Sequence, residues 1–191
     1  MMSPLRIRSG VPVLVSVALA SLFAASVAGR DRTGGAPIPP TDTVAPAALQ
    51  TLLPAPDGWT KARAGSEVIA LSPQTSYASA NVLFTKDTMT LRVTLADTGG
   101  VKDTLISLAT MVMTLPEDYS EVVPPATTIK RSVFKGSPAA EMWDSANAEG
   151  EFVVVVGGRF VARVEGSHLD AADTLRSILA LVDLKKLAEL K

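Results

Sequence analysis

The chain has no cysteine among its 191 residues, and its single histidine is His168. The missing cysteines exclude disulfide bonds and thiolate metal sites. A single histidine excludes the zinc sites that are built from several imidazole ligands. We therefore expect the protein to carry no metal and no other cofactor.

The chain also lacks a cluster of basic residues. It has 18 Lys and Arg against 19 Asp and Glu, which gives a formal net charge of −1, and the basic residues are scattered along the sequence. Proteins that bind nucleic acid concentrate positive charge on one face. We therefore expect no nucleic-acid partner.

Two common functional motifs are missing. The chain has no G-x-S-x-G sequence, which presents the nucleophile of many hydrolases, and no D-x-[DN]-x-[DN]-G sequence, which begins an EF-hand calcium loop. Gly157-Gly158 lies in "VVVVGGRFVARVEG". A phosphate-binding glycine loop leads from a strand into a helix. Because an alternating segment follows this pair, the pattern favours a β-hairpin with a type I′ turn.

Residues 1–28 have the pattern of an export signal. Arg6 and Arg8 precede an apolar stretch from Val11 to Val27, and Ser26-Val27-Ala28 offers small residues to a signal peptidase. The alternative is an uncleaved membrane anchor, since the stretch is close to the lower length limit for a span. The small residues favour cleavage, so we expect a periplasmic or secreted protein with no stable membrane span.

Cleavage after Ala28 leaves 163 residues with 16 basic and 19 acidic side chains, a net charge of −3. Residues 29–45 are rich in glycine, proline and polar residues, which predicts a flexible linker. Residues 46–191 form the expected single domain. A domain of this size buries about 70% of the surface of its unfolded chain, enough for a stable core without disulfides.

Periodicity in residues 46–191 predicts both strands and helices. Apolar residues alternate over 78–84 and 89–95, which predicts a hairpin, and further strands are expected at 128–135, 139–144, 151–156 and 159–166. Residues 59–72 are expected to be extended, with a break or bulge at Gly65. Helices are expected at 46–53, at 101–115, and from an N-cap at Asp170 to the C-terminus, with Asp183 capping a last short helix. Residues 117–128 are expected to form an exposed loop.

These elements predict an α+β fold. We expect a single antiparallel sheet of about 5–7 strands, with helices packed on one face and a helix at the C-terminus.

Four residues are candidates for a binding site: Trp59, Tyr119, Trp143 and His168. Trp143 alternates with Met142, so it either contacts a partner or packs under a helix. His168 lies between a strand and a helix, where it could be catalytic or could be a polar loop residue. No residue is assigned a catalytic role on this evidence.

Carboxylates could in principle catalyse acid–base chemistry in pairs. The candidates are Glu117, Asp118 and Glu121 in one group, and Glu149 and Glu151 in another. Neither group lies among apolar residues in the sequence that would raise a pKa. We interpret both groups as solvated surface.

The segments "LLPAPDGW", "SYASANVLF" with "MTLRVTLAD", and "VVVVGGRFVARVEG" followed by "DLKKLAELK" resemble a group of small exported bacterial proteins of unknown function. The resemblance runs from about Leu49 onward and implies a shared fold more than a shared activity. The order of elements is also loosely similar to PsbP/Mog1-like domains. That likeness implies a protein-binding adaptor and assigns no binding residues.

We therefore expect a non-enzymatic exported domain that binds a protein partner or an apolar small molecule. The alternative is a hydrolase-type enzyme that uses carboxylates or His168 in a cleft. A cleft in which these groups converge would separate the two hypotheses.

The first prediction concerns the N-terminus. Mass spectrometry of the protein recovered from the cell envelope or medium is expected to show a chain that starts near Gly29, because the small residues before it suit a signal peptidase. A chain that retains residues 1–28 would identify the segment as an anchor instead.

Overall fold

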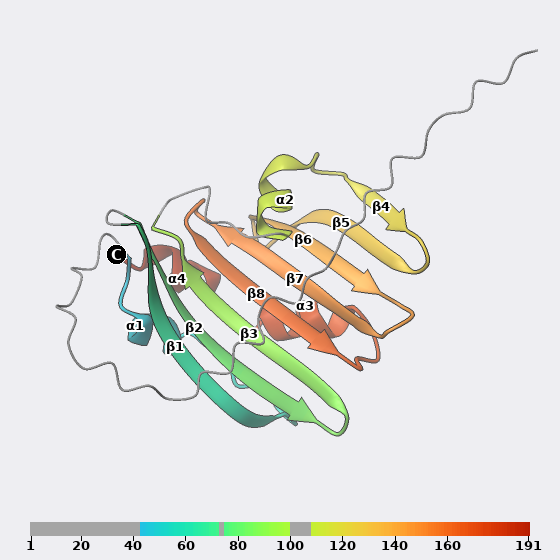
Figure 1. The fold of residues 1–191 in the computed structure, drawn as a ribbon, viewed down its shortest axis with the longest axis horizontal. Coiled ribbons are helices and arrows are strands. Elements are labelled where there is room, and N and C mark those ends of the chain that lie inside the picture. The colour runs from blue at the N-terminus through green and yellow to red at the C-terminus, as the bar shows by residue number, and fades with distance from the viewer. Residues whose placement is uncertain (1–42, 73–74, 100–107) are drawn as a thin grey trace, which may run out of the picture. The chain divides into compact units, whose positions relative to one another are not determined.

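A computed structural model describes residues 43–72, 75–99 and 108–191, which all belong to one compact unit, Ile38–Lys191. The described part contains a large antiparallel sheet and four short helices (Figure 1). The strands are β1 (Thr60–Ser72), β2 (Thr75–Lys86), β3 (Met89–Asp97), β4 (Ser120–Val123), β5 (Thr127–Phe134), β6 (Ser137–Asp144), β7 (Glu149–Val156) and β8 (Phe160–Ser167). The helices are α1 (Pro46–Gln50), α2 (Leu108–Thr114), α3 (Asp173–Leu179) and α4 (Leu184–Glu189).

The eight strands lie in the order β1-β2-β3-β8-β7-β6-β5-β4. Every neighbour pair except β3 and β8 is consecutive in the chain, so the sheet is two antiparallel meanders that join in the middle. Val93 of β3 pairs with Val164 of β8 at this junction. Within the first meander, Val82 pairs with Val93, which confirms the hairpin predicted from alternation.

The glycine pair forms the predicted turn between β7 and β8. Gly157 has a φ of 60° and Gly158 a φ of 68°. Both positions of a type I′ turn require positive φ, which glycine adopts without a steric penalty. Strand β8 follows directly, so these glycines form a hairpin turn and not a phosphate-binding loop.

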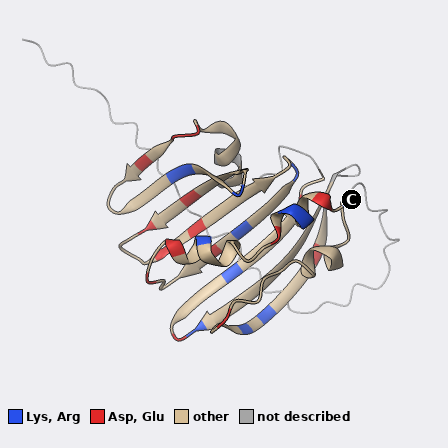
Figure 2. Ribbon diagram, turned by 180° about the vertical axis from the view of Figure 1, so that it is seen from behind, with Lys and Arg blue, Asp and Glu red and all other residues tan. Residues whose placement is uncertain are grey.

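The main core lies on the face of the sheet that carries α1, α3 and α4, here called the back face. Figure 2, seen from behind, shows the C-terminal helices crossing the sheet. Helix α1 contacts β1, β2 and β3, while α3 and α4 contact β7 and β8. The strand side chains buried here include Val82, Phe84, Leu91, Val93, Leu95, Phe152, Val154, Ala162 and Val164.

A second, smaller core lies on the opposite face, here called the front face. Helix α2 packs on β6 and β7. Its Ala109 and Val112 contact a cluster that contains Ala140, Val153 and Val155. Both faces of the middle of the sheet are therefore covered by helices.

The predicted fold class is wrong in three respects. The sheet has eight strands rather than about 5–7, and strands dominate the structure. The additional strand is β4, which lies inside residues 117–128, expected to be a loop. Helices lie on both faces rather than one, because the valine run of β7 presents apolar side chains to both sides.

Several element boundaries also differ from the predictions. Strand β1 is continuous through Gly65, and its register shifts between Lys61 and Arg63 instead. Helix α3 has Ala172 rather than Asp170 as its N-cap residue. Asp183 caps α4 as predicted, by accepting a hydrogen bond from the Lys186 backbone N–H at 3.0 Å.

Some predicted segments fall outside the described residues. These are the export signal, the linker up to residue 42, and residues 101–107 of the helix expected at 101–115. Among the residues that the structure does describe, none of the helices has the length and apolar character needed to cross a membrane.

A buried ion pair fixes the start of the domain to the sheet. The Asp97 carboxylate is fully buried and accepts two hydrogen bonds from Arg159, both 2.8 Å long. It also accepts bonds from the backbone N–H groups of Val44 (2.7 Å) and Gly99 (2.9 Å). Burial opposes ionisation of Asp97, but the Arg159 and backbone bonds together outweigh it and lower the pKa of Asp97.

We predict that Asp97→Ala destabilises the domain by about 3 kcal/mol, the lower end of the cost of breaking a buried pair, since Arg159 remains partly exposed. The folded state lowers the pKa of Asp97, so the ionised carboxylate stabilises the fold. This contribution to the free energy of unfolding is complete above about pH 5 and is lost as the pH falls below about 4. Urea unfolding between pH 3 and pH 7 measures both effects. The variant should have a flatter pH profile than the wild type, and an equally steep profile would contradict this assignment.

Candidate functional site

A hollow on the back face begins with the turn that joins α1 to β1. After α1, the chain runs through Leu53-Pro54-Ala55-Pro56 and reverses at Asp57-Gly58. The Trp59 N–H donates to the Pro56 carbonyl at 3.4 Å. Gly58 has a φ of 75°, which the third position of a type II turn requires. This turn directs the Trp59 side chain onto the sheet, where it packs against the main core.

The hollow between this segment and the sheet has a volume of about 610 Å³ and is here called the tryptophan groove. Its floor is formed by Val82 and Phe84 of β2, which are 1% and 3% exposed. One wall is formed by the segment from Leu53 to Trp59, and Ala64 of β1 lies opposite. The groove thus has an apolar floor that belongs to the core and an aromatic wall that is half-buried.

The rim of the tryptophan groove is polar. Gln50, Asp57 and Lys61 lie there, and all three are exposed. The rim therefore carries one cation, one anion and one amide. These side chains can form hydrogen bonds with a polar group at one end of a ligand. Because the two charges are opposite, the rim does not select for a ligand of either net charge.

The structure does not bring the four predicted candidates together. Trp59 lines the tryptophan groove, whereas Tyr119 lies just before β4 at the far edge of the sheet. Trp143 of β6 packs against the main core, and a Cβ atom built on Gly150 would lie 2.8 Å from its ring and 3.2 Å from Leu175 of α3. Trp143 thus packs under a helix, the second of the two roles considered for it.

His168 and Tyr119 are placed without catalytic partners. His168 is exposed in the turn after β8, with a φ of 58°, and within the described residues no hydrogen bond or ion pair of its ring is recorded. The Tyr119 hydroxyl donates to the Glu121 carboxylate, and this bond raises the pKa of Tyr119. Neither residue lines the tryptophan groove.

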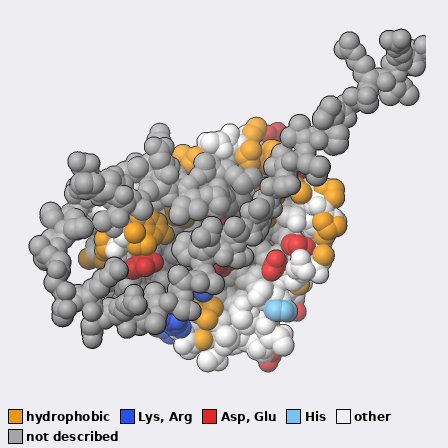
Figure 3. Space-filling model, viewed as in Figure 1, with side chains coloured by type: hydrophobic (Ala, Val, Ile, Leu, Met, Phe, Trp, Pro, Cys, Tyr) orange, Lys and Arg blue, Asp and Glu red, His pale blue; other side chains and the backbone are white. Residues whose placement is uncertain are grey.

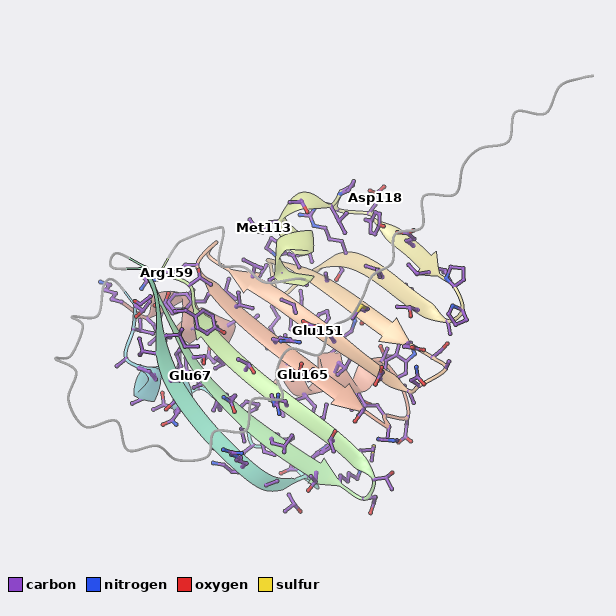
Figure 4. All side chains as sticks on the ribbon, viewed as in Figure 1. Glu67, Met113, Asp118, Glu151, Arg159 and Glu165 are labelled. Atoms are coloured by element: carbon purple, nitrogen blue, oxygen red, sulfur yellow. The ribbon has the colours of Figure 1, made fainter. Side chains whose placement is uncertain are left out.

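The front face carries a charged cluster that the sequence did not predict. Arg163 of β8 lies 2.7 Å from Glu151 and 2.6 Å from Glu165, and Arg92 lies 3.2 Å from Glu165. Figure 4 shows Glu151 and Glu165 near each other in the middle of the sheet, with Glu67 on β1 farther away. The four charges alternate in sign across three neighbouring strands.

Glu151 is 8% exposed, so its interpretation as solvated surface is wrong. Burial raises the pKa of Glu151, and the charge of Arg163 only partly opposes this effect. Burial also raises the pKa of Tyr77 on the same face. Perturbed pKa values occur at functional sites and also in structural ion-pair networks.

The geometry favours the structural reading of this cluster. Each of its carboxylates and guanidinium groups already has a partner of opposite charge. The tryptophan groove lies on the other face, and a second hollow of about 570 Å³ lies beside Lys135 and Leu181. Glu117, Asp118, Glu121 and Glu149 are exposed, as expected.

Within the described residues, no group of three or more His, Asp or Glu side chains could hold a metal ion. No protein-family model, no curated protein and no solved structure matches the chain. The resemblance to small exported bacterial proteins and to PsbP/Mog1-like domains therefore stays a prediction.

Sequence reasoning missed most of the tryptophan groove. The segment "LLPAPDGW" was noted for its resemblance to other proteins. The floor residues Val82 and Phe84 were placed on a strand without a link to Trp59. The signal that could have indicated a site is the apolar and aromatic character of a turn that would otherwise be polar.

We predict that Glu151→Gln raises the urea midpoint above that of the wild type at pH 7.5. The folded state raises the pKa of Glu151, so folding favours the protonated carboxyl. This contribution to stability is lost as the pH rises through the folded pKa, and above it the buried carboxylate destabilises the fold. Glutamine stays neutral at every pH and avoids this cost. The difference between variant and wild type should shrink as the pH falls. Glu149→Gln, an exposed position on the same strand, is the matched control and should show no such pattern.

Proposed function

We propose that the protein is an exported, non-enzymatic binding domain, and that the tryptophan groove binds a small, neutral, apolar molecule. The observation that carries this proposal is the groove itself, with its apolar core floor and its aromatic wall. Its volume of about 610 Å³ lies within the range of small-molecule sites, roughly 300–1,000 Å³. Export is supported by the pattern of residues 1–28.

The electrostatics of the groove support a neutral ligand. The floor offers no buried charge that would need a counter-ion, and the rim charges of Asp57 and Lys61 are opposite in sign and exposed. An apolar ligand gains free energy by removing its own surface and the half-exposed Trp59 ring from water, while the buried floor supplies van der Waals contact. A polar group on the ligand can remain at the rim beside Gln50.

The position of the reactive groups supports binding over hydrolysis. Of the groups considered for catalysis, neither His168 nor any of the candidate carboxylates lines the tryptophan groove. A hydrolase would need an acid, a base or a nucleophile within hydrogen-bond reach of the bound substrate. The ionisable groups that line the groove, Asp57 and Lys61, are both exposed at its rim.

The test uses the two tryptophans as an internal control. Trp143→Phe leaves Trp59 as the only tryptophan. Titration with the neutral probe N-phenyl-1-naphthylamine should quench Trp59 saturably, with a Kd on the order of 10 μM for a ligand of this size. Unsaturable quenching would contradict the proposal.

A filling variant tests the location of binding. Ala64 is exposed on β1 and lines the groove, whereas Ser66 is exposed two residues farther along the same face and does not. Ala64→Tyr should raise the Kd at least about tenfold, because the new ring occupies the hollow. Ser66→Tyr adds the same ring outside the groove and should leave the Kd unchanged. Equal effects of the two variants would place the probe elsewhere.

A further inference from the structure

The outer strand β4 presents an unpaired backbone edge. It is the last strand of the sheet and pairs only with β5 among the described strands. The Arg131 N–H donates to the Tyr119 carbonyl at 2.9 Å, and the ladder continues with Glu121 opposite Ile129. In an antiparallel ladder the hydrogen-bonded residues alternate. The N–H and C=O groups of Ser120 and Val122 therefore point away from β5, toward the open edge.

The two edges of the sheet differ in their protection against further pairing. Strand β1 carries the exposed charges Lys61, Arg63 and Glu67, and its register is irregular between Lys61 and Arg63. Charges, bulges, prolines and short length all protect an edge strand. Strand β4 has one charge, Glu121, and only four residues before Pro124, but it has no register shift. The β4–β5 pairing is regular throughout.

The side chains of β4 expose apolar surface on both faces. Val122 is 67% exposed and Val123 is 36% exposed. In Figure 3, hydrophobic side chains gather at the rim where Figure 1 places β4 and the β4–β5 turn. Pro124 and Pro125, both exposed, continue this patch into the turn.

The surroundings of this edge are acidic. Glu117, Asp118 and Glu121 are exposed, and residues 116–126 contain no Lys or Arg. Lys130 and Arg131 lie one strand further in, on β5, and the Arg131 side chain donates to the Leu115 carbonyl, so the acidic residues are the outermost charges at this edge. Figure 4 places Asp118 at the outer rim of the sheet, just before β4. Two copies that paired through β4 would bring these like charges together, which costs free energy, whereas a basic segment would be attracted.

We infer that β4 is a docking edge for an extended segment of a partner protein that carries Lys or Arg beside aliphatic residues. The segment adds to the sheet as a further antiparallel strand. Its backbone bonds Ser120 and Val122, its aliphatic side chains cover Val122 and Val123, and its basic side chains face the acidic rim. This surface is separate from the tryptophan groove.

The test measures binding of a fluorescein-labelled peptide that contains the sequence KVTVK to the mature protein by fluorescence polarisation. We expect saturable binding, at least tenfold tighter than binding of the matching EVTVE peptide. A KVTVK peptide that is N-methylated at the amides facing β4 should lose binding, and this control leaves the protein unchanged. No saturable signal with KVTVK, or equal binding of both unmethylated peptides, would overturn the inference.

Protein variants locate the site. Val122→Pro removes an N–H that β5 does not use, and it should weaken KVTVK binding at least tenfold while the circular dichroism spectrum is retained. The double variant Glu117→Lys with Asp118→Lys should also weaken binding. Its matched control is Asp170→Lys with Glu189→Lys, two exposed positions that give the same change in net charge, and it should have a smaller effect. Equal loss in both double variants would overturn the charge argument.

Self-association is the alternative occupant of the edge. Analytical ultracentrifugation of the mature protein should show a monomer. A dimer that Val122→Pro abolishes would assign the edge to a second copy and overturn the inference. Ala64→Tyr should not change peptide binding, so failure here and failure of the groove proposal are distinguishable.

Discussion

Strand β7 has apolar side chains on both faces, and this constraint organises the sheet. Successive side chains of a strand point to opposite sides, so Val153 and Val155 face the front while Phe152 and Val154 face the back. One layer of helices cannot bury both sets. The chain covers the back of β7 with α3 and the front with α2. The strands next to β7 share this cover, and the outermost strand β4 stays exposed along its whole length.

The tryptophan groove forms where the helices on the back face do not reach. Helices α3 and α4 contact β7 and β8, so the back of β1 and β2 must be covered by α1 and the segment after it. That segment contains Pro54 and Pro56, which lack an N–H and do not continue the helix. A thin, irregular cover over this strand pair leaves a hollow. A ligand there would displace water from the half-exposed Trp59 ring without repacking the core.

Local patterns predicted the parts of the fold that local physics determines. The Val82–Val93 hairpin and the Gly157-Gly158 turn were predicted because alternation and turn chemistry act over a few residues. Strand β4 was missed because four residues before two prolines show no clear period, and pairing with β5 makes them a strand. The groove was missed because it joins Trp59 to a strand more than twenty residues later in the sequence. The run of valines at 153–156 indicates a strand that is buried on both faces. It does not indicate which helix covers which face.

Because the two edges of the sheet carry opposite charges, the fold must prevent β1 of one copy from pairing with β4 of another. Lys61 and Arg63 lie on β1, and acidic residues lie beside β4, so the edges of different copies attract each other. Pairing of β1 with β4 of the next copy would be heterologous and would not close, which produces open-ended filaments. The irregular register between Lys61 and Arg63 twists β1 away from a regular ladder at the point where it would meet a new strand. An interrupted ladder is a poor template for a further strand, whereas the regular β4 edge is available to a different chain.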